Sequence, residues 1–445
     1  MKYKNKHIIT TIFFCSLVMS VAWAQKLTKR EAIRLTLENN YGILIATNAI
    51  EAAKNNKGIL NSGYLPSITG TARADYQLTT TNTSFPDSDD PDREIKGAET
   101  QSYNVGLNLN YTLFDGLGRF YNYKKLKAEH NLTQLEARET IENTILQLFS
   151  VYYEVARLSE NVKVLEETLH ISKERVTRSE YQFEYGQNTK LNVLNAQVDV
   201  ANDSINLLNT RQQLINTRRD LAVILDSKKD KVFSVDTVVQ FIPKLRVDEY
   251  MKKAKENNVT LLRNRMALHI SDYDVKISKS GYLPTVDLVG SYGWNQSRNP
   301  PRIFFPSNIG NTTTLSAGIN LSWNLFDGGT TITRLKNAKI ALDNQELLIK
   351  QLQVGVERDM ENALGTYQNR LKIFEIQQQN VSTNQHNFKR SKERFKLGQI
   401  TSIEFRQAQI NLLNAKTNKN LAKYNAKIAE LQLLQLTGQL LNVDF

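Results

Sequence analysis

The sequence predicts a mixed fold, in which long antiparallel coiled-coil helices are joined to four amphipathic β-strands. Three observations predict it: motifs recur at a nearly constant spacing, polar and apolar residues alternate in four segments, and elsewhere apolar residues recur every three to four positions. The chain has 445 residues, of which 40% are hydrophobic and 23% charged. This composition excludes a polytopic helical membrane protein and a disordered chain.

Residues 1–24 have the three parts of a secretory signal peptide. Basic residues precede an apolar run over 8–21, and an Ala-Trp-Ala cleavage site follows at 22–24. A membrane anchor is the alternative, but the run is shorter than the roughly 20 residues that span a bilayer. The only cysteine, Cys15, lies in this run, so we expect an exported mature chain without disulfides.

The formal net charge of +12 does not by itself predict nucleic-acid binding. The chain carries an export signal, and its basic residues stand beside acidic ones along the predicted helices. The sequence has no Walker loop, no dinucleotide fingerprint and no histidine or cysteine spacing of a zinc site. We therefore expect no enzymatic activity, no cofactor, no metal site and no nucleic-acid partner.

Internal repetition organises the whole mature chain. A Gly-Tyr-Leu-Pro motif at 63–66 recurs at 281–284, and a Leu-Phe-Asp-Gly motif at 113–116 recurs at 325–328. A Phe-x-x-Gly-Gln motif follows each of them, and ten residues after its glycine stands an Ala-Gln pair. These matches predict a signal peptide (1–24), a first repeat (25–226), a linker (227–246) and a second repeat (247–445).

Alternation of polar and apolar residues predicts four strands of about ten residues, over 67–79, 103–113, 286–295 and 315–325. A sheet half-buried on a soluble core would alternate too. Here, however, the polar face is mostly neutral, and both mature tryptophans lie on the apolar face, as in a membrane girdle. The predicted lipid-facing girdle comprises Tyr111, Tyr292, Trp294 and Trp323. Four strands are too few to close a barrel, which predicts pairing between chains in an oligomer.

The remaining segments predict helices. One helix precedes the strands of each repeat, over 27–62 and 247–280, and a long helix follows, which in the first repeat covers 116–185. That long helix would measure about 105 Å, and the two helices flanking it would together be about equally long. Each repeat is therefore predicted to form an antiparallel hairpin of two rods, with strands at one end and a glycine turn at the other.

The duplicated motifs resemble the TolC-type outer membrane efflux protein family over essentially the whole mature chain. The resemblance implies a homotrimer, in which each chain gives four strands to a transmembrane β-barrel and its helices to a long α-helical barrel in the periplasm. It also implies a passive exit duct in the bacterial outer membrane, part of a tripartite export system for efflux or type I secretion. The implied partners are a periplasmic adaptor (membrane fusion) protein, an inner membrane transporter and outer membrane lipid.

The resemblance also implies two functional sites. The adaptor-docking turns of the family match Tyr185, Gly186, Gln187, Asn188 and Thr189 in the first repeat, and Leu397, Gly398, Gln399, Ile400, Thr401 and Ser402 in the second. The periplasmic gate matches Glu404 and Gln407, with Asn192 and Asn195 at the equivalent positions of the first repeat. Family members often carry carboxylates at the positions of both Glu404 and Gln407, so that three chains form two stacked rings of acidic side chains. This chain has a carboxylate only at Glu404 and therefore keeps at most one acidic ring.

Three alternatives explain less of the sequence. A secreted or surface coiled-coil adhesin would account for the helices but not for strands at equal positions in both repeats. A periplasmic enzyme would need convergent polar residues, and a general porin would need many more strands per chain. The acidic segment 87–94 is predicted to be a solvated loop between strands.

Overall fold

The computed structural model describes residues 26–226 except 88 and 90, then 234–301 and 306–443. The predicted signal peptide and the first part of the predicted linker, 227–233, lie outside the described residues. The chain divides into two compact units. The helical unit comprises Met1–Asn48, Glu136–Leu262 and Gln351–Phe445, and the strand unit comprises Ala49–Leu135 and Arg263–Lys350.

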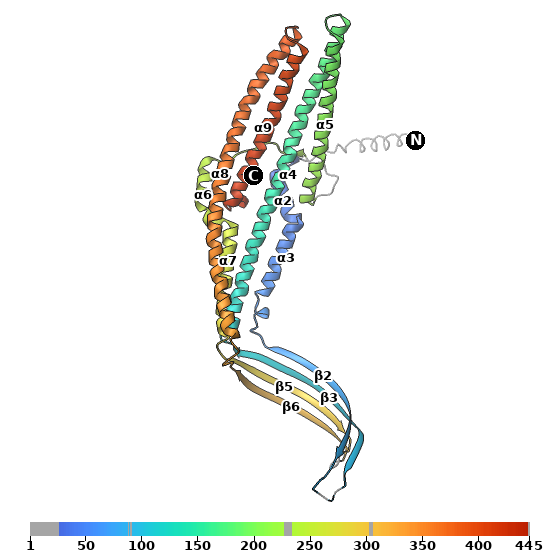
Figure 1. Cartoon of the computed structure of the whole chain (residues 1–445), viewed down its shortest axis with the longest axis vertical. Helices are drawn as coiled ribbons and strands as arrows, with labels where there is room; N and C mark the ends of the chain where they lie inside the picture. Colours follow the sequence, from blue (N-terminus) through green and yellow to red (C-terminus); the bar gives the residue numbers. More distant parts are fainter. Residues whose placement is uncertain (1–25, 88, 90, 227–233, 302–305, 444–445) are drawn as a thin grey trace, which may run out of the picture. The chain divides into compact units, whose positions relative to one another are not determined.

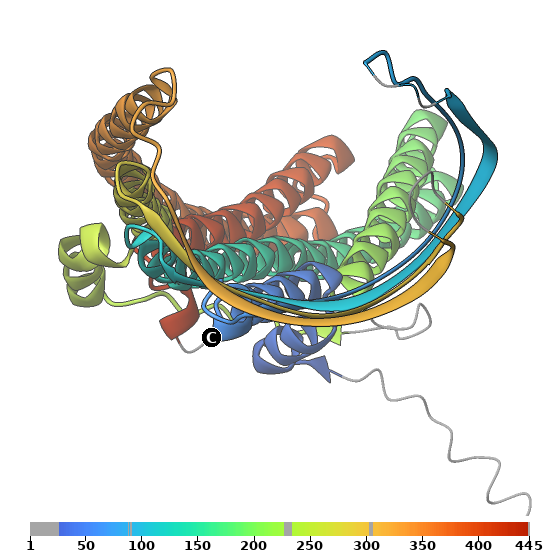
Figure 2. The ribbon, with the colours of Figure 1, turned by 90° about the horizontal axis from the view of Figure 1, so that it is seen from below.

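A single four-stranded antiparallel sheet dominates the strand unit (Figure 1). Its strands are β2 (Ser67–Thr83), β3 (Arg93–Phe114), β5 (Thr285–Asn299) and β6 (Asn308–Ser322), in the order β2-β3-β5-β6. The β3–β5 pairing, from Gln101↔Arg298 to Phe114↔Val286, joins two hairpins that are far apart in the sequence. Figure 2 shows the four strands as one strongly curved layer.

The register places the apolar residues of all four strands on one face. Leu107 of β3 lies beside Gly70 of β2 and Tyr292 of β5, and Tyr292 lies beside Leu315 of β6. Leu315 is 79% exposed and Ile319, on the same face, is 71% exposed. The opposite face is polar: the Thr112 hydroxyl donates to the Asp287 carboxylate at 2.6 Å. Nothing within the described chain covers the apolar face.

The strands are longer than the alternation predicts, with 17 residues in β2, 22 in β3 and 15 in each of β5 and β6. Alternation marks only the length over which one face is apolar, whereas backbone pairing continues through polar residues such as Thr83↔Arg93. The predicted fourth strand, 315–325, was also misplaced. β6 ends at Ser322, so Trp323 and Leu325 lie beyond it.

Two pairs of helices of equal length follow the strands. α4 (Gly118–Glu184) and α8 (Thr330–Lys396) each have 67 residues, and α5 (Lys190–Ile224) and α9 (Ser402–Leu436) each have 35. The apolar positions of α4 face the core of the helical unit, where Leu148, Tyr152 and Val155 are fully buried. Among the described residues, no helix carries an apolar stretch that could cross a bilayer.

A short parallel strand pair joins residues 26–27 to residues 234–235. β1 (Lys26–Leu27) pairs with β4 (Ser234–Val235). The hydroxyl of Tyr152 donates to the Leu27 carbonyl and accepts the Asp236 N–H, both at 2.8 Å. One buried tyrosine on the long helix thereby holds both strands.

The predicted helices 27–62 and 247–280 are each broken near an asparagine. The first is divided into α2 (Lys29–Asn39), α3 (Tyr41–Asn56) and a short 3₁₀ turn η1 (Ile59–Asn61), and the second into α6 (Lys244–Asn257) and α7 (Val259–Ser280). Asn40 and Asn258, at the break points, have extended ψ angles of 122° and 119°. The prediction of continuous helices was therefore wrong, because asparagine side chains compete well for backbone groups at helix ends.

Each break-point asparagine performs the same two functions. Its side-chain oxygen caps the following helix: Asn258 Oδ1 accepts the Leu261 N–H at 3.0 Å, and Asn40 Oδ1 accepts the Gly42 N–H at 3.0 Å. Its side-chain NH₂ bonds a carbonyl at the end of another helix, Leu436 for Asn258 at 2.8 Å and Ile224 for Asn40 at 3.2 Å. These amides therefore join three helix ends at one point.

We predict that Asn258→Ala lowers stability by about 2 kcal/mol, because it removes a helix cap and leaves the partly buried Leu436 carbonyl without its hydrogen bond. Asn258 is only 4% exposed. The measurement is thermal unfolding of the purified protein in detergent, followed by helical circular dichroism. Glu256→Ala, in the exposed last turn of α6, is the matched control and should change the melting temperature little. Equal shifts from both substitutions would show that the asparagine is not a junction.

Candidate functional site

The two helix-to-helix turns have the same backbone structure. At the α4–α5 turn, the Gln187 N–H bonds the Gln182 carbonyl at 2.7 Å and the Gly186 N–H bonds the Phe183 carbonyl at 3.0 Å. At the α8–α9 turn, Gln399 and Gly398 form the corresponding bonds at 2.9 and 3.1 Å. Both glycines have positive φ, 69° and 71°, a conformation that glycine adopts without strain. The Phe-x-x-Gly-Gln spacing that occurs twice in the sequence thus encodes two Schellman-type helix ends.

Apolar side chains are exposed at both turns. Tyr185 is 77% exposed and Leu397 72% exposed, one residue before each glycine. Ile403, in the first turn of α9, is 68% exposed, and Leu191, in the first turn of α5, is 64% exposed. No atom lies within 4 Å of the position that a Cβ would take at either glycine. The turns therefore present apolar side chains and open backbone together, as protein-binding surfaces do.

The predicted gate residues make local hydrogen bonds at the start of α5 and α9. Thr401 and Glu404 form a capping box: the Thr401 N–H donates to Glu404 Oε2 at 2.8 Å, and the Glu404 N–H donates to Thr401 Oγ1 at 3.2 Å. Gln407 donates to Asn411 Oδ1 at 2.8 Å, one turn along α9. In the first repeat Asn192 bonds Asn188, and Asn195 is exposed.

The capping box also affects the charge of Glu404. Hydrogen bonds from the Thr401 N–H and hydroxyl lower the pKa of the Glu404 carboxyl below its ordinary value. The side chain is exposed and stays ionised at neutral pH. The structure thus gives Glu404 a helix-capping role in addition to the predicted role at the gate.

A buried ionic network begins two residues after Glu404, at Arg406 of α9. Arg406 donates through two guanidinium nitrogens to the two carboxylate oxygens of Asp203 on α5, both at 2.8 Å. Ser172 on α4 donates to the same carboxylate at 2.6 Å, and Asp199 binds Arg175. The Asp203 side chain is 2% exposed and the Arg406 side chain 12% exposed. Bidentate geometry and low exposure make this a strong link between α9 and the α4–α5 hairpin.

Neighbouring polar and aromatic contacts complete the link. Gln409 donates to the Thr168 carbonyl and to Ser172 Oγ, both at 2.9 Å. Phe405 stacks on Phe395 with ring centroids 4.8 Å apart and on Phe388 at 5.6 Å. This end of α9 is therefore fastened to α4 and α5 on one side and to α8 on the other.

Sequence reasoning missed this network. In the sequence, the residues of this network resemble the charged residues of ordinary solvent-exposed helix faces. Only the tertiary structure brings Arg406, Asp203 and Asp199 together. The Ala-Gln pair that recurs after each turn was the available signal. In the second repeat it supplies the buried Gln409, whereas Gln197 of the first repeat is exposed.

The predicted girdle residues lie on two strands, β3 and β5, and just beyond the end of a third, β6. Tyr292 is 55% exposed and Trp294 40% exposed on the apolar face of β5, and Tyr111 of β3 pairs with Leu288 on that face. Trp323 lies just beyond β6, 54% exposed, and its indole N–H donates to the Tyr282 carbonyl at 3.2 Å. In the described ranges, no three acidic, histidine or cysteine side chains could hold a metal ion together.

Comparison with known proteins yields the same picture of the chain. The family model described as outer membrane efflux protein matches residues 32–226 and 250–439. Outer membrane efflux protein BepC of Brucella suis biovar 1 is 21% identical over 403 residues, covering 91% of this chain and 83% of that protein. Outer membrane protein TolC of Vibrio cholerae is 22% identical over 435 residues, covering 96% and 93%.

Solved structures of outer membrane channels share the fold. The CmeC outer membrane channel of Campylobacter jejuni superposes with a TM-score of 0.74 at 18% identity, covering 93% of this chain and 86% of that one. The family model matches most of the sequence, in both of its halves, and this match establishes the family of the chain. The chain belongs to the outer membrane efflux protein family and is located in the outer membrane.

Proposed function

We propose that three copies of this chain form a passive exit duct in the outer membrane, as part of a tripartite export system for efflux or type I secretion. In this arrangement each chain gives one four-stranded sheet to a closed β-barrel, and the helices form a periplasmic barrel. A periplasmic adaptor docks at the helical turns, and an inner membrane transporter supplies energy. Family membership supports efflux and gives no support to a coiled-coil adhesin.

The observation that carries the proposal is the sheet itself. One face is apolar and widely exposed, and the described chain leaves the outer edges of β2 and β6 without a strand partner. In a bilayer, unpaired backbone groups cost several kcal/mol each, so sheet edges must be paired before the sheet can span lipid. Copies of the same sheet, joined β6 to β2, satisfy both requirements.

We predict that Leu315→Arg destabilises the assembled barrel by about 2–4 kcal/mol, the cost of an arginine on the lipid face near the bilayer centre. Leu315 lies beside Tyr292, well inside the apolar face. The measurement is the amount of heat-modifiable oligomer in outer membrane fractions.

Thr314→Arg is the matched control, because Thr314 is the preceding residue and points to the polar face, opposite Gly293. It should assemble nearly normally. Equal loss of oligomer from both variants would show that the orientation of the sheet is wrong.

The exposed turns are proposed as the docking site for the adaptor. Their surface consists of open backbone, apolar residues such as Tyr185 and Leu397, and the amides of Gln187 and Gln399. We predict that Gln187→Asp combined with Gln399→Asp abolishes cross-linking to the adaptor and export, since two new charges per chain would be desolvated on docking.

The control for the docking test is Gln213→Asp with Gln378→Asp, the same change at exposed positions in mid-helix. Assembly is checked first by heat-modifiable oligomer. Gln187 and Gln399 form the hydrogen bonds of the turns through their backbone N–H groups. Their side chains can therefore be changed without removing those hydrogen bonds. Retention of adaptor cross-linking by inserted oligomers of the turn variant would contradict the docking proposal.

The gate is proposed to lie at the start of α9, with Glu404 as its one acidic ring and Gln407, Asn192 and Asn195 as neutral neighbours. Three carboxylates near one axis attract cations strongly when the aperture is narrow and poorly solvated. We predict cation-selective channels in planar bilayers, with weak block by trivalent cations added on the periplasmic side. Glu404→Gln should abolish this block, and Gln407→Asp should strengthen it.

The glutamine substitution is chosen because its amide oxygen can still accept the Thr401 N–H, so the helix start is preserved. Glu361→Gln, an exposed carboxylate in the middle of α8, controls for a loss of net charge. Unchanged selectivity and block in Glu404→Gln would place the gate elsewhere.

A further inference from the structure

The β2–β3 hairpin and the helix starts at the other end of the sheet carry opposite charge. At the hairpin end, segment 87–94 contains five acidic residues and one arginine. At the other end, where all four strands connect to helices, segment 119–127 of α4 contains four basic residues and no acidic one. Segment 334–339 of α8 contains three basic residues and no acidic one. The fold does not require this contrast in charge, which suggests that the basic segments interact with a negatively charged partner.

The basic residues lie close to the sheet. α4 begins at Gly118, four residues after β3 ends, and Lys127 is nine residues farther, about 14 Å along the helix. The start of α4 is packed on the α7–β5 connection: a Cβ at Gly116 would lie 2.6 Å from the Ser280 carbonyl oxygen. A layer of about this depth next to the apolar face is where lipid headgroups begin.

Two of these lysines stand on aromatic rings. Lys124 Nζ lies 4.4 Å from the centre of the Phe120 ring, and Lys127 Nζ lies 4.1 Å from that of Tyr123. Tyr64 packs edge-on against Tyr123 at 6.0 Å. We call these five residues the collar. Aromatic rings that carry lysine ammonium groups beside an apolar surface are typical of a membrane–water interface.

The charge of the collar is available to a partner. Neighbouring cations are neutralised: Lys125 pairs with Asp274 at 2.7 Å, and Lys276 with Asp272 at 2.6 Å. Lys124 and Lys127 are exposed, and among the described residues no carboxylate lies within ion-pair distance of either. A surface with unneutralised lysines, contiguous with an apolar face, is complementary to anionic headgroups.

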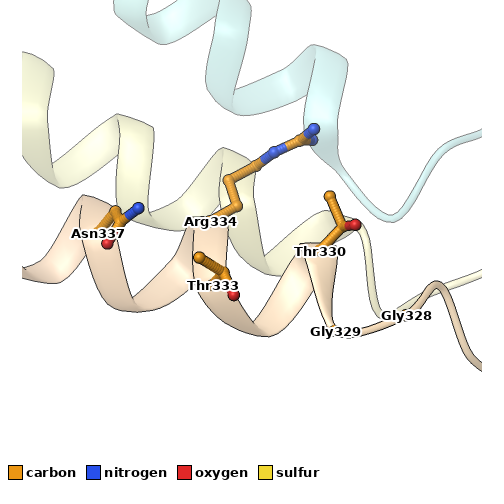
Figure 3. Close-up of a pocket in the computed structure, with 6 residues that line it drawn as sticks. All are labelled: Gly328, Gly329, Thr330, Thr333, Arg334 and Asn337. Carbon is orange, nitrogen blue, oxygen red and sulfur yellow. The ribbon is translucent and has the colours of Figure 1, made fainter.

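A shallow hollow of about 520 Å³ at the start of α8 extends this positive surface (Figure 3). Arg334 extends away from Thr333 and Asn337, which line the same hollow. Asp327 already caps the start of α8: its carboxylate accepts the Thr331 N–H of the first turn at 2.9 Å and the Gly329 N–H just before the helix at 3.2 Å. The hollow therefore contributes the charge of Arg334 and no separate anion site.

We propose that the collar binds anionic phospholipid headgroups of the leaflet on the helix side of the outer membrane. The inference rests on the proposed function in one respect, that the apolar face of the sheet contacts lipid. It adds a preference for lipid charge at the helix end of the sheet, which the hairpin end, with its acidic β2–β3 hairpin, does not share.

The two tryptophans of the described chain report on the two regions separately. Trp323 lies at the helix end of the sheet, and Trp294 lies nine residues beyond the start of β5, toward the hairpin end. The chain from residue 25 onward, which lacks Trp23 of the predicted signal peptide and carries either Trp294→Phe or Trp323→Phe, is reconstituted into vesicles of phosphatidylcholine and phosphatidylglycerol in equal amounts. One lipid or the other is brominated, and the quenching of the remaining tryptophan gives the ratio of the two association constants.

We expect about a fivefold or larger preference for phosphatidylglycerol at Trp323, which decreases with added salt, and none at Trp294. Lys124→Gln with Lys127→Gln should remove most of the preference. Lys124→Arg with Lys127→Arg should keep it, and so should Lys163→Gln with Lys389→Gln, an equal loss of charge at exposed sites in the helical unit.

Equal preference at the two tryptophans would overturn the proposal, and this comparison needs no lysine substitution. Retention of the preference by the Lys→Gln pair would overturn it as well. Heat-modifiable oligomer is measured first in every sample. Its absence in the unsubstituted chain would contradict the proposed channel, whereas an inserted oligomer without lipid preference contradicts only the collar.

Discussion

The hydrogen-bonded ladder between β3 and β5 is the constraint on which the strand unit depends. It is the pairing that joins the two halves of the chain into one sheet, and its register decides that Leu107 and Tyr292 share a face. A shift of one residue would send the apolar set of one hairpin to the polar face of the other. Asn104 and Asn295, which bond across the ladder on the polar face, favour the observed register.

In the helical unit, the corresponding constraint is electrostatic. Burying Asp203 would be very costly alone, and it is tolerated because Arg406 and Ser172 satisfy both of its oxygens. Such a network has one good geometry, so it defines the position of α9 against the α4–α5 hairpin more sharply than apolar contacts do. Phe405 stacks on two phenylalanine rings of α8 and so helps to hold α9 against α8, but an apolar contact of this kind fixes the relative position of the two helices less sharply.

The sequence predicts the periodic features of this protein well and its tertiary polar contacts poorly. Alternation and three-to-four spacing locate four strands and the long helices, because a face or stripe of apolar residues is a local property. Strand ends were misjudged where both faces are polar, and the helix breaks at Asn40 and Asn258 were missed because an asparagine amide can either stay solvated or cap a helix. Arg406 and Asp203, about two hundred positions apart, carry no local signal of their contact.

The helical unit and the sheet differ in what they need in order to become stable. The helical unit buries its own aromatic core around Tyr152 and Tyr153, and it pairs the buried Asp203 with Arg406. The sheet instead exposes its apolar face and leaves two outer edges unpaired within the described chain. About half of the backbone groups of an edge strand point outward, and in lipid each would cost several kcal/mol. A single sheet with unpaired edges therefore cannot enter a bilayer alone. In the proposed channel, insertion therefore awaits neighbouring chains, and closure of the barrel and burial of its lipid-facing surface are one step.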